Sequence, residues 1–360
     1  EAAKEIFPLS GGKHFDNLSA KFLSEKFKCA NALVTPSCSS ALELSMIILN
    51  LKAGDEVVMP SYTFSSTANA VALRGATPVF VDVDPETFNI NPHCIKEAIT
   101  ENTKCILVVH YGGVSCDMDS VLKIAKASGI YVVEDAAQAI GAKYKDRYLG
   151  TIGNLGTFSF HETKNVVCGE GGSILFRESQ FYDRAEIIRE KGTNRRQFLR
   201  GEIDKYTWRE IGSSFLLGEI SCYYLYHQLL ALEEINKYRL NSWNFYFENT
   251  KNLETQGYFK RQLIPSFCNS NGHMFFIVLE KNIDRQVLLA QLREKGVFAS
   301  SHYIPLHETT AGKVYGRISG ELPVTNRLHS RLIRLPLYYG ISKAQQEYVI
   351  HTLTNLLRHY

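Results

Sequence analysis

The first two-thirds of the chain alternates short apolar runs with segments of helical periodicity, and this alternation limits the possible folds. The apolar runs, typical of buried strands, cover residues 31–34, 56–59, 78–83, 105–110 and 130–133. Helix-like segments such as 117–127, with a stop signal at Gly129, separate them. Strands and helices of this length form βαβ units, so the sequence predicts an α/β fold with a mostly parallel central sheet.

The last third of the chain changes character. Residues 227–247 read as one long helix, and residues 274–279 as a strand. Helices are predicted over residues 284–294 and 345–358. We therefore expect a large domain over residues 1–233 and a smaller C-terminal α+β domain over residues 234–360.

Composition excludes several classes of protein. The 40 basic and 37 acidic side chains leave a formal net charge of only +3 without a dense basic run, which argues against nucleic-acid binding. No apolar segment approaches the ~18 residues of a membrane span. The eight scattered cysteines include no CxxC pair and indicate reduced thiols in a cytoplasmic protein. The histidines have no metal-ligand spacing, so we expect no metal.

Two segments carry the strongest chemical signals. Asp135 ends the apolar run of residues 130–133, where ligands gather in a parallel sheet. A buried carboxylate there can keep a cofactor's ring nitrogen protonated, although capping of the next turn explains it equally well. Lys164 follows the strand-like TFSF and precedes a glycine cluster. A desolvated lysine is a nucleophile, whereas a lone lysine in a glycine turn is usually a surface residue; the upstream Asp135 favours the chemical interpretation.

Two further segments add weaker signals. Residues 35–43, TPSCSSALE, open a helix with hydroxyl groups and form either an anion site or an ordinary serine cap. Residues 60–70 place Tyr62 and Phe64 after a strand end, where either ring could stack on a flat ligand or pack in the core. The chain has neither GxGxxG nor GxxxxGK[ST], so dinucleotide and P-loop sites do not explain these segments.

In this order and spacing, the four segments resemble the DegT/DnrJ/EryC1/StrS sugar aminotransferase family, a branch of the aspartate aminotransferase superfamily. The stretches SFHETKN, GEGG and HYIPLH carry the resemblance further, over nearly the whole chain. Within the family, the chain looks most similar to the branch that makes dTDP-4-amino-4,6-dideoxygalactose. The resemblance implies a fold type I transferase that depends on pyridoxal 5'-phosphate.

The resemblance also implies a role for each matching residue. Lys164 would be the catalytic lysine that joins the cofactor as a Schiff base, and Asp135 would pair with the pyridine nitrogen. Gln138, one helical turn after Asp135, would bond the ring hydroxyl, and Phe64 would stack on the ring. The implied phosphate contacts are Ser39, Ser40 and Ser159.

The implied reaction moves an amino group from L-glutamate to a dTDP-linked 4-keto sugar, for a cell-surface polysaccharide. Arg195, in the basic run that includes Arg189, is a candidate for the sugar's diphosphate; a solvated helix face is the alternative. Tyr303 and His307 are candidates for the sugar pocket, or else a plain loop aromatic and a histidine with its hydrogen bonds satisfied.

A homodimer with a shared active site is also implied. Many relatives carry an asparagine that reaches the partner's phosphate, and Leu216 stands there in this chain, with Ser213 or Ser214 as replacements. Three alternatives remain open: amination at C3, a 4-amino product with the gluco configuration, and a non-catalytic regulator that binds the same cofactor.

Overall fold

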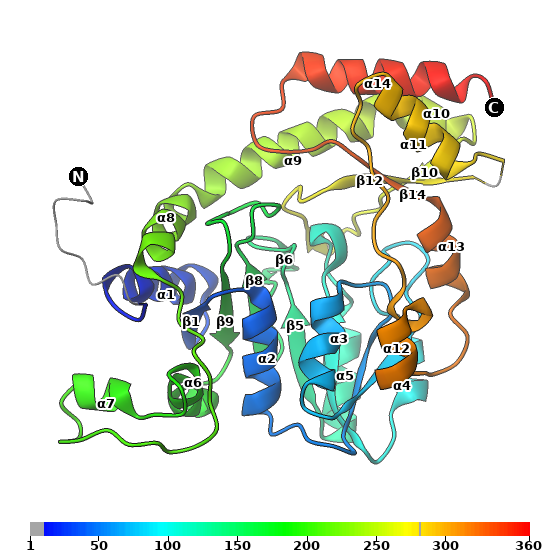
Figure 1. Ribbon diagram of the computed structural model, residues 1–360. Helices are drawn as coiled ribbons and strands as arrows, with labels where there is room; N and C mark the ends of the chain where they lie inside the picture. Colours follow the sequence, from blue (N-terminus) through cyan, green and yellow to red (C-terminus); the bar gives the residue numbers. More distant parts are fainter. Residues whose placement is uncertain (1–10, 281) are drawn as a thin grey trace.

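A mixed sheet of eight strands forms the centre of the molecule (Figure 1). The computed structural model describes residues 11–280 and 282–360, so the first ten residues of the predicted large domain lie outside the described part. Every strand of this sheet is parallel to the others except β9, which runs antiparallel to both of its neighbours. In spatial order the strands are β1 (Asn31–Thr35), β9 (Gly172–Phe176), β8 (Leu155–Ser159), β5 (Tyr131–Asp135), β4 (Thr103–Val109), β2 (Glu56–Pro60), β3 (Thr77–Val81) and β13 (Arg317–Ile318). The predicted α/β class with a mostly parallel sheet is confirmed.

Successive side chains along each strand point to opposite faces of this sheet and fill a core on each face. In β4, Ile106 and Val108 enter one core, and Cys105 and Leu107 enter the other. Both faces are covered, which explains why the strands read as continuous apolar runs rather than as an alternating pattern. The first core packs against α1 (His14–Phe27), α4 (Pro92–Ala98), α5 (Met118–Ser128) and α8 (Glu219–Leu230). The second packs against α2 (Cys38–Ile48), α3 (Ser65–Ala72) and α6 (Tyr182–Arg189).

Helix ends follow from local chemistry. The Asp117 side chain caps the start of α5, and Gly129 ends it in the left-handed conformation, as the sequence predicts. Ser342 and Gln345 form a reciprocal capping box at the start of α14 (Lys343–Leu357). Asp284 caps α11 (Arg285–Glu294).

A second, three-stranded sheet carries the C-terminal part of the chain. It contains β10 (Phe259–Arg261), β12 (Phe275–Leu279) and β14 (Leu332–Leu335), all antiparallel. Its core packs under α9 (Leu232–Asn249), α11 and α14, which lie together at the top of Figure 1. The division at residues 233 and 234 falls in the first turn of α9 and stays a prediction.

The prediction of one helix over residues 227–247 is wrong. Ala231 leaves helical geometry with φ −91° and ψ 4°, so the segment is split between α8 and α9. The physical reason is that the two helices bury different faces. Leu225 and Leu229 of α8 enter the core of the large sheet, whereas Trp243 and Tyr246 of α9 enter the C-terminal core.

The chain crosses back to the large sheet near its end. After α11, residues 300–309 descend to α12 (Thr310–Tyr315), and β13 then pairs with β3 at the sheet edge. The Arg317 guanidinium donates to both carboxylate oxygens of Glu56, at 2.6 and 2.7 Å. The remaining elements are β6 (Lys143–Tyr144), β7 (Arg147–Tyr148), β11 (Cys268–Asn269), α7 (Arg195–Leu199), α10 (Lys251–Thr255) and α13 (Pro323–Arg331). Among the described residues, no helix combines the length and apolar character that crossing a membrane demands.

Candidate active site

A cavity of about 500 Å³ lies where strands of the large sheet end and the C-terminal sheet faces them. The ends of β5 and β8 and the first turns of α2 and α3 form its floor. The loop between β8 and β9 forms one side, and residues of the C-terminal part form the opposite wall. The carboxyl ends of parallel strands are where ligands bind in such sheets.

Asp135 ends β5 and lines this cavity with a carboxylate that is held on two sides. Its Oδ2 accepts a hydrogen bond from the Thr67 hydroxyl at 2.9 Å, and its Oδ1 accepts one from the Ala137 amide at 3.1 Å. Burial raises the pKa of Asp135, and the Thr67 and Ala137 bonds oppose that rise. A positively charged ligand group beside this carboxylate would therefore be stabilised.

Glu134 points to the other face of β5 and takes no part in the cavity, because consecutive strand residues alternate. Its carboxylate accepts bonds from the amides of Gly150, Ile152 and Gly153 at 2.6–2.8 Å. His110 Nε2 also lies 2.8 Å from it. All these groups are buried, so Glu134 fixes the backbone that presents Asp135.

Lys164 enters the same cavity from the loop between β8 and β9. Its backbone amide donates to the carbonyl of His161 at 2.9 Å, which tightens the turn that carries the side chain. Burial lowers the pKa of the Lys164 amine, and the positive charge of Arg334 lowers it further. Cys38 and Asp135 act in the opposite direction and raise this pKa. A lowered pKa leaves more of the amine unprotonated and nucleophilic near neutral pH. His161 lines the cavity beside it.

A cluster of hydroxyl groups surrounds the N-terminus of α2. Ser37, the N-cap, accepts from the Ser40 amide at 3.0 Å, and Ser39 Oγ lies 2.6 Å from Ser66 Oγ of α3. Ser37, Ser39, Ser66 and Ser159 line the cavity, whereas the Ser40 hydroxyl turns to Ser37 and is outside that lining. Hydroxyls at a helix N-terminus form a site for a phosphate.

Gly172 lets the backbone close this end of the cavity. A Cβ on Gly172 would lie 2.3 Å from the carbonyl carbon of Ser37 and 2.4 Å from the amide nitrogen of Cys38. Only a residue without a side chain allows β9 to pass so close to the start of α2.

Phe64 and Tyr303 form the aromatic part of the wall. Phe64 is half exposed to the cavity and its ring centroid lies 6.1 Å from that of Tyr303. Tyr62 instead is buried against Tyr111 and Tyr303, outside the cavity lining. Of the two aromatics that the sequence singles out, Phe64 is the one a ligand can reach.

Gln138 also lines the cavity, but no helix carries it. Residues 136–142 form successive turns, so the expected helical turn between Asp135 and Gln138 is wrong. Its side-chain oxygen accepts from the Gly112 amide at 2.7 Å, and its Nε2 donates to the Tyr303 hydroxyl at 2.8 Å. Gln138 thus joins the end of β4 to the C-terminal part of the chain.

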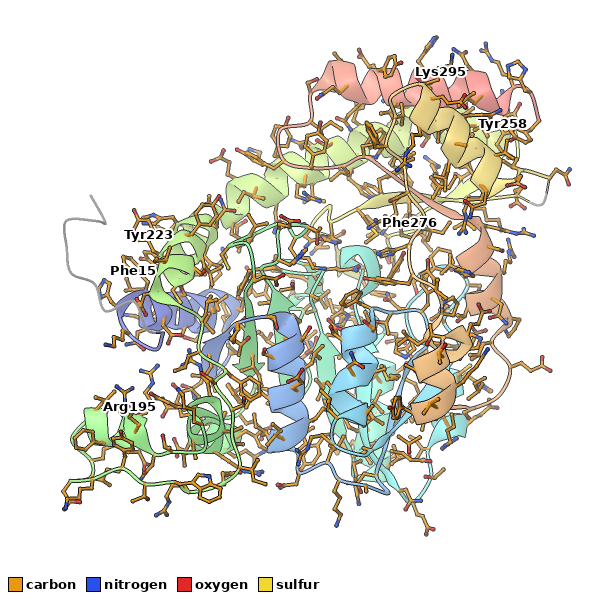
Figure 2. All side chains as sticks on the ribbon, in the orientation of Figure 1. Phe15, Arg195, Tyr223, Tyr258, Phe276 and Lys295 are labelled. Atoms are coloured by element: carbon orange, nitrogen blue, oxygen red, sulfur yellow. The ribbon has the colours of Figure 1, made fainter. Side chains whose placement is uncertain are left out.

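The residues predicted to bind the sugar nucleotide are not all brought together. Tyr303 lines the cavity, whereas His307 Nδ1 lies 2.7 Å from Ser61 Oγ and fastens the loop to the end of β2. Arg195 lies on α7 (Figure 2) and is outside the cavity lining, and its guanidinium pairs with Glu190 at 2.5 Å. Arg189, of the same basic run, is buried and bonded to Asp16 and to the Val34 carbonyl, so its role is structural.

The segment around Leu216 also lies outside this cavity. Ser213 and Ser214 are exposed and run beside residues 188–191, with backbone hydrogen bonds between Ser213 and both Ile188 and Lys191. A contact from either serine to a partner subunit stays a prediction.

Sequence reasoning missed Thr67, which bonds Asp135 from outside the cavity lining, and several side chains of the lining itself. Thr67 lies in the first turn of α3, where it is buried behind the Asp135 carboxylate. His273 and Arg334 come from the C-terminal part, and nothing in their local sequence indicates the cavity, whereas His302 stands directly before the predicted Tyr303.

These groups fit pyridoxal 5'-phosphate. Asp135 offers a buried carboxylate for a protonated ring nitrogen, and Lys164 offers an amine for the aldehyde. The serine hydroxyls at the start of α2 suit the phosphate, and Phe64 offers a ring face. In the described residues, no group of three or more His, Cys, Asp or Glu side chains has the arrangement of a metal site.

Comparison with known proteins supports this interpretation. Residues 3–354 match the model of the DegT/DnrJ/EryC1/StrS aminotransferase family. An uncharacterized protein of Methanocaldococcus jannaschii is 35% identical over 331 residues, which are 90% of this chain and 84% of that protein. The spore coat polysaccharide biosynthesis protein SpsC of Bacillus subtilis is 30% identical over 96% of this chain and 89% of its own length. The crystal structure of the aminotransferase TlmJ from Streptoalloteichus hindustanus superposes with a TM-score of 0.88 at 28% identity, covering 98% of this chain and 93% of that one.

Proposed function

The chain belongs to the DegT/DnrJ/EryC1/StrS aminotransferase family, whose members depend on pyridoxal phosphate, and we propose that it aminates a nucleotide-linked keto sugar. L-glutamate gives the amino group and dTDP-4-keto-6-deoxyglucose receives it at C4. The products are dTDP-4-amino-4,6-dideoxygalactose and 2-oxoglutarate. The observation that carries the proposal is that the amine of Lys164 and the carboxylate of Asp135 line one cavity. The polysaccharide pathway named for the relative SpsC supports a sugar acceptor.

The chain's own residues divide the work of amino transfer. When bound, pyridoxal phosphate supplies an electrophilic carbon and an electron-withdrawing ring. Asp135 holds a proton on the ring nitrogen, with Thr67 fixing the carboxylate. The Lys164 amine, with its lowered pKa, would take a proton from Cα of the amino acid and deliver it to the cofactor carbon that carried the aldehyde. Ser39, Ser66 and Ser159 would hold the phosphate, and Tyr303, which accepts a hydrogen bond from Gln138, also lines the cavity.

We propose a homodimer as the working form. Large apolar side chains are exposed along residues 206–224, where a second copy would cover them. Trp208 is 76% exposed, Ile211 68% and Ile220 70%, in the segment that also contains Ser213, Ser214 and Leu216. A dimer through this surface would give these residues and Arg195 access to a partner's cavity, which sedimentation of the purified protein can test.

The product identifies the reaction. Incubation with glutamate and dTDP-4-keto-6-deoxyglucose, followed by NMR of the sugar, is expected to show a C4 amino group in the galacto configuration. A C3 amino sugar or a gluco product would replace the proposal by one of the two alternatives within the family.

The visible spectrum separates an enzyme from a non-catalytic regulator. Glutamate alone is expected to bleach the band of the lysine-bound cofactor, because the first half of the reaction needs no sugar. A band that glutamate leaves unchanged would favour the regulator.

A further inference from the structure

Two cavities border the loop that carries Lys164. The second has a volume of about 560 Å³ and lies between this loop, the junction of α8 and α9, and residues 337–339; it shares only Thr163 and Lys164 with the lining of the catalytic cavity. A backbone bond from Lys164 to His161 closes the loop on itself, and Val166 enters the core of the large sheet. A loop beside two open spaces gains little support from close packing there, so its position depends on bonds to the rest of the molecule.

Asn165, the residue after the lysine, connects the loop to other segments. It is buried, and its Nδ2 donates to Asn236 Oδ1 at 2.8 Å and to the Asn271 carbonyl at 3.0 Å. Its Oδ1 lies 2.9 Å from His273 Nδ1. Asn236 belongs to α9, and Asn271 and His273 stand between β11 and β12. Asn165 therefore binds the lysine loop to the C-terminal part of the chain.

Backbone carbonyls fix the direction of each amide in this group. Asn236 Nδ2 donates to the Ile140 carbonyl at 2.9 Å, so its Oδ1 faces Asn165. Asn165 presents its two N–H donors to that oxygen and to the Asn271 carbonyl, and its own oxygen to His273, whose Nδ1 must then donate. Burial lowers the pKa of His273 well below its usual value, which agrees with a neutral ring. Every donor and acceptor of the Asn165 side chain is thus used.

The same group holds the turn that carries Gln138. Asn271 Nδ2 donates to the carbonyls of Gln138 and Ile140 at 3.0 and 3.1 Å. Asn236 holds the same Ile140 carbonyl, and a Cβ on Gly141 would lie 2.5 Å from Asn236 Nδ2, so a side chain at 141 would push this contact apart. The lysine loop and the Gln138 turn are thereby held at one spacing, on two sides of the catalytic cavity.

We propose that Asn165 is a positioning residue for Lys164, an inference that rests on the proposed function. The Lys164 amine has to meet the cofactor aldehyde and later reach the Cα proton of the amino donor. A displacement of about 1 Å costs such a step about 100-fold in rate. Asn165 is outside the lining of the catalytic cavity, so it acts only through the lysine that it holds.

The pKa of Lys164 reports the position of its amine. Burial is the largest cause of its lowered pKa, so an amine released toward solvent regains a pKa nearer the ordinary value. The midpoint of covalent capture of pyridoxal phosphate by the apoenzyme is therefore expected to move to higher pH in Asn165→Ala. The variant leaves in place the other titratable or charged groups around the amine, which are His161 of its own loop, Cys38 of α2, Asp135 of β5, Arg334 of β14, His273 and His302.

Bleaching of the visible band by glutamate tests the second task on the holoenzyme. In Asn165→Ala the rate at saturating glutamate is expected to fall about 100-fold. The glutamate concentration that gives half of this rate is expected to stay unchanged, because Asn165 lies outside the cavity lining. Deuterium at Cα of glutamate is expected to slow the variant more than the unmodified enzyme, since proton transfer becomes the slow step.

Asn89→Ala is the matched control. Asn89 is also a buried asparagine with three bonds to its surroundings: its Nδ2 donates to the carbonyls of Val114 and Ser115, and its Oδ1 accepts from the Tyr111 amide. This variant is expected to lose a comparable amount of stability in urea and to keep the pH midpoint of the unmodified protein.

A second variant keeps the test open if Asn165→Ala does not fold. Asn236→Ala removes one of the three bonds of Asn165 and is expected to shift the midpoint in the same direction by a smaller amount. In the double variant the two shifts are expected to add up to less than their sum, because both changes break the same bond.

An unchanged midpoint or a near-normal bleaching rate in Asn165→Ala overturns the inference. An equal shift in Asn89→Ala does so too, since lost stability alone would then account for it. If the unmodified apoenzyme fails to capture pyridoxal phosphate covalently, the proposed function fails instead, so the two failures are distinguishable.

Discussion

Replacing Thr67 with valine tests whether the Asp135 carboxylate is held ready for a charged ring nitrogen. The change keeps the shape of the side chain and removes one of the two hydrogen bonds to that buried carboxylate. A hydrogen bond to a charged group contributes about 1.5–3 kcal/mol. Its loss raises the pKa of Asp135 further, because the charged form loses a supporting hydrogen bond.

Cofactor affinity is the quantity to measure. A less stable charged carboxylate stabilises a protonated ring nitrogen less well, so the dissociation constant of pyridoxal phosphate is expected to rise about 10- to 100-fold in Thr67→Val. Equilibrium dialysis of the apoenzyme measures this constant. Thr63→Val is the matched control, since Thr63 Oγ1 lies 2.9 Å from Thr67 Oγ1 and the structure gives it no bond to Asp135. In Thr63→Val the affinity for pyridoxal phosphate is expected to fall tenfold or less, because a neutral hydrogen bond contributes about 1 kcal/mol. Equal affinities for both variants and the unmodified protein would refute the reasoning.

Two further predictions concern Lys164 in the cavity, and a third concerns the buried ion pair between Asp16 and Arg189. Lys164→Ala is expected to slow the glutamate half-reaction by at least about 1000-fold, since Lys164 is the one amine among the described residues that line the cavity. A near-normal rate in stopped-flow spectroscopy would remove Lys164 from the reaction. Burial lowers the pKa of Lys164, so the apoenzyme should react covalently with pyridoxal phosphate at lower pH than a free lysine does. The reaction rate should decline only below the lowered pKa. A rate profile with its midpoint near the ordinary value of about 10.4 would contradict this. Asp16→Asn leaves the buried guanidinium of Arg189 without its carboxylate and is expected to lower the free energy of unfolding in urea by about 3–5 kcal/mol. Asp119→Asn, which breaks an exposed pair with Lys145, is the control and should leave this free energy nearly unchanged.

The sequence predicts those parts of the site that lie within single βα units. Asp135 stands at a strand end and Lys164 follows another, so strand prediction alone places both at one edge of the sheet. The cap at Ser37 and the stop at Gly129 are similarly local, because each depends on hydrogen bonds or dihedral angles within a few residues. These features need no knowledge of how distant segments pack.

Other parts of the site depend on long-range packing that local patterns do not encode. Arg334 and His302 reach the cavity only because the C-terminal sheet turns one face to the large sheet. In HYIPLH, the sequence offers Tyr303 and His307 equally as candidates for the sugar pocket. Only the structure separates them, because His307 bonds to Ser61, which stands 246 residues earlier in the chain. The break at Ala231 has the same cause, since two separate cores compete for one helical segment.

The antiparallel strand β9 has a consequence for how the protein is made. It fills the gap between β1 and β8, and it pairs Asn31 with Phe176, so the first strand waits for a partner that emerges much later from the ribosome. Until then both neighbouring strands expose open edges, which are sites of misassembly. The hydroxyl cluster that receives the phosphate is complete only once Gly172 passes the start of α2. Nascent chains shorter than this point therefore lack a complete phosphate site, and the C-terminal wall of the cavity emerges later still.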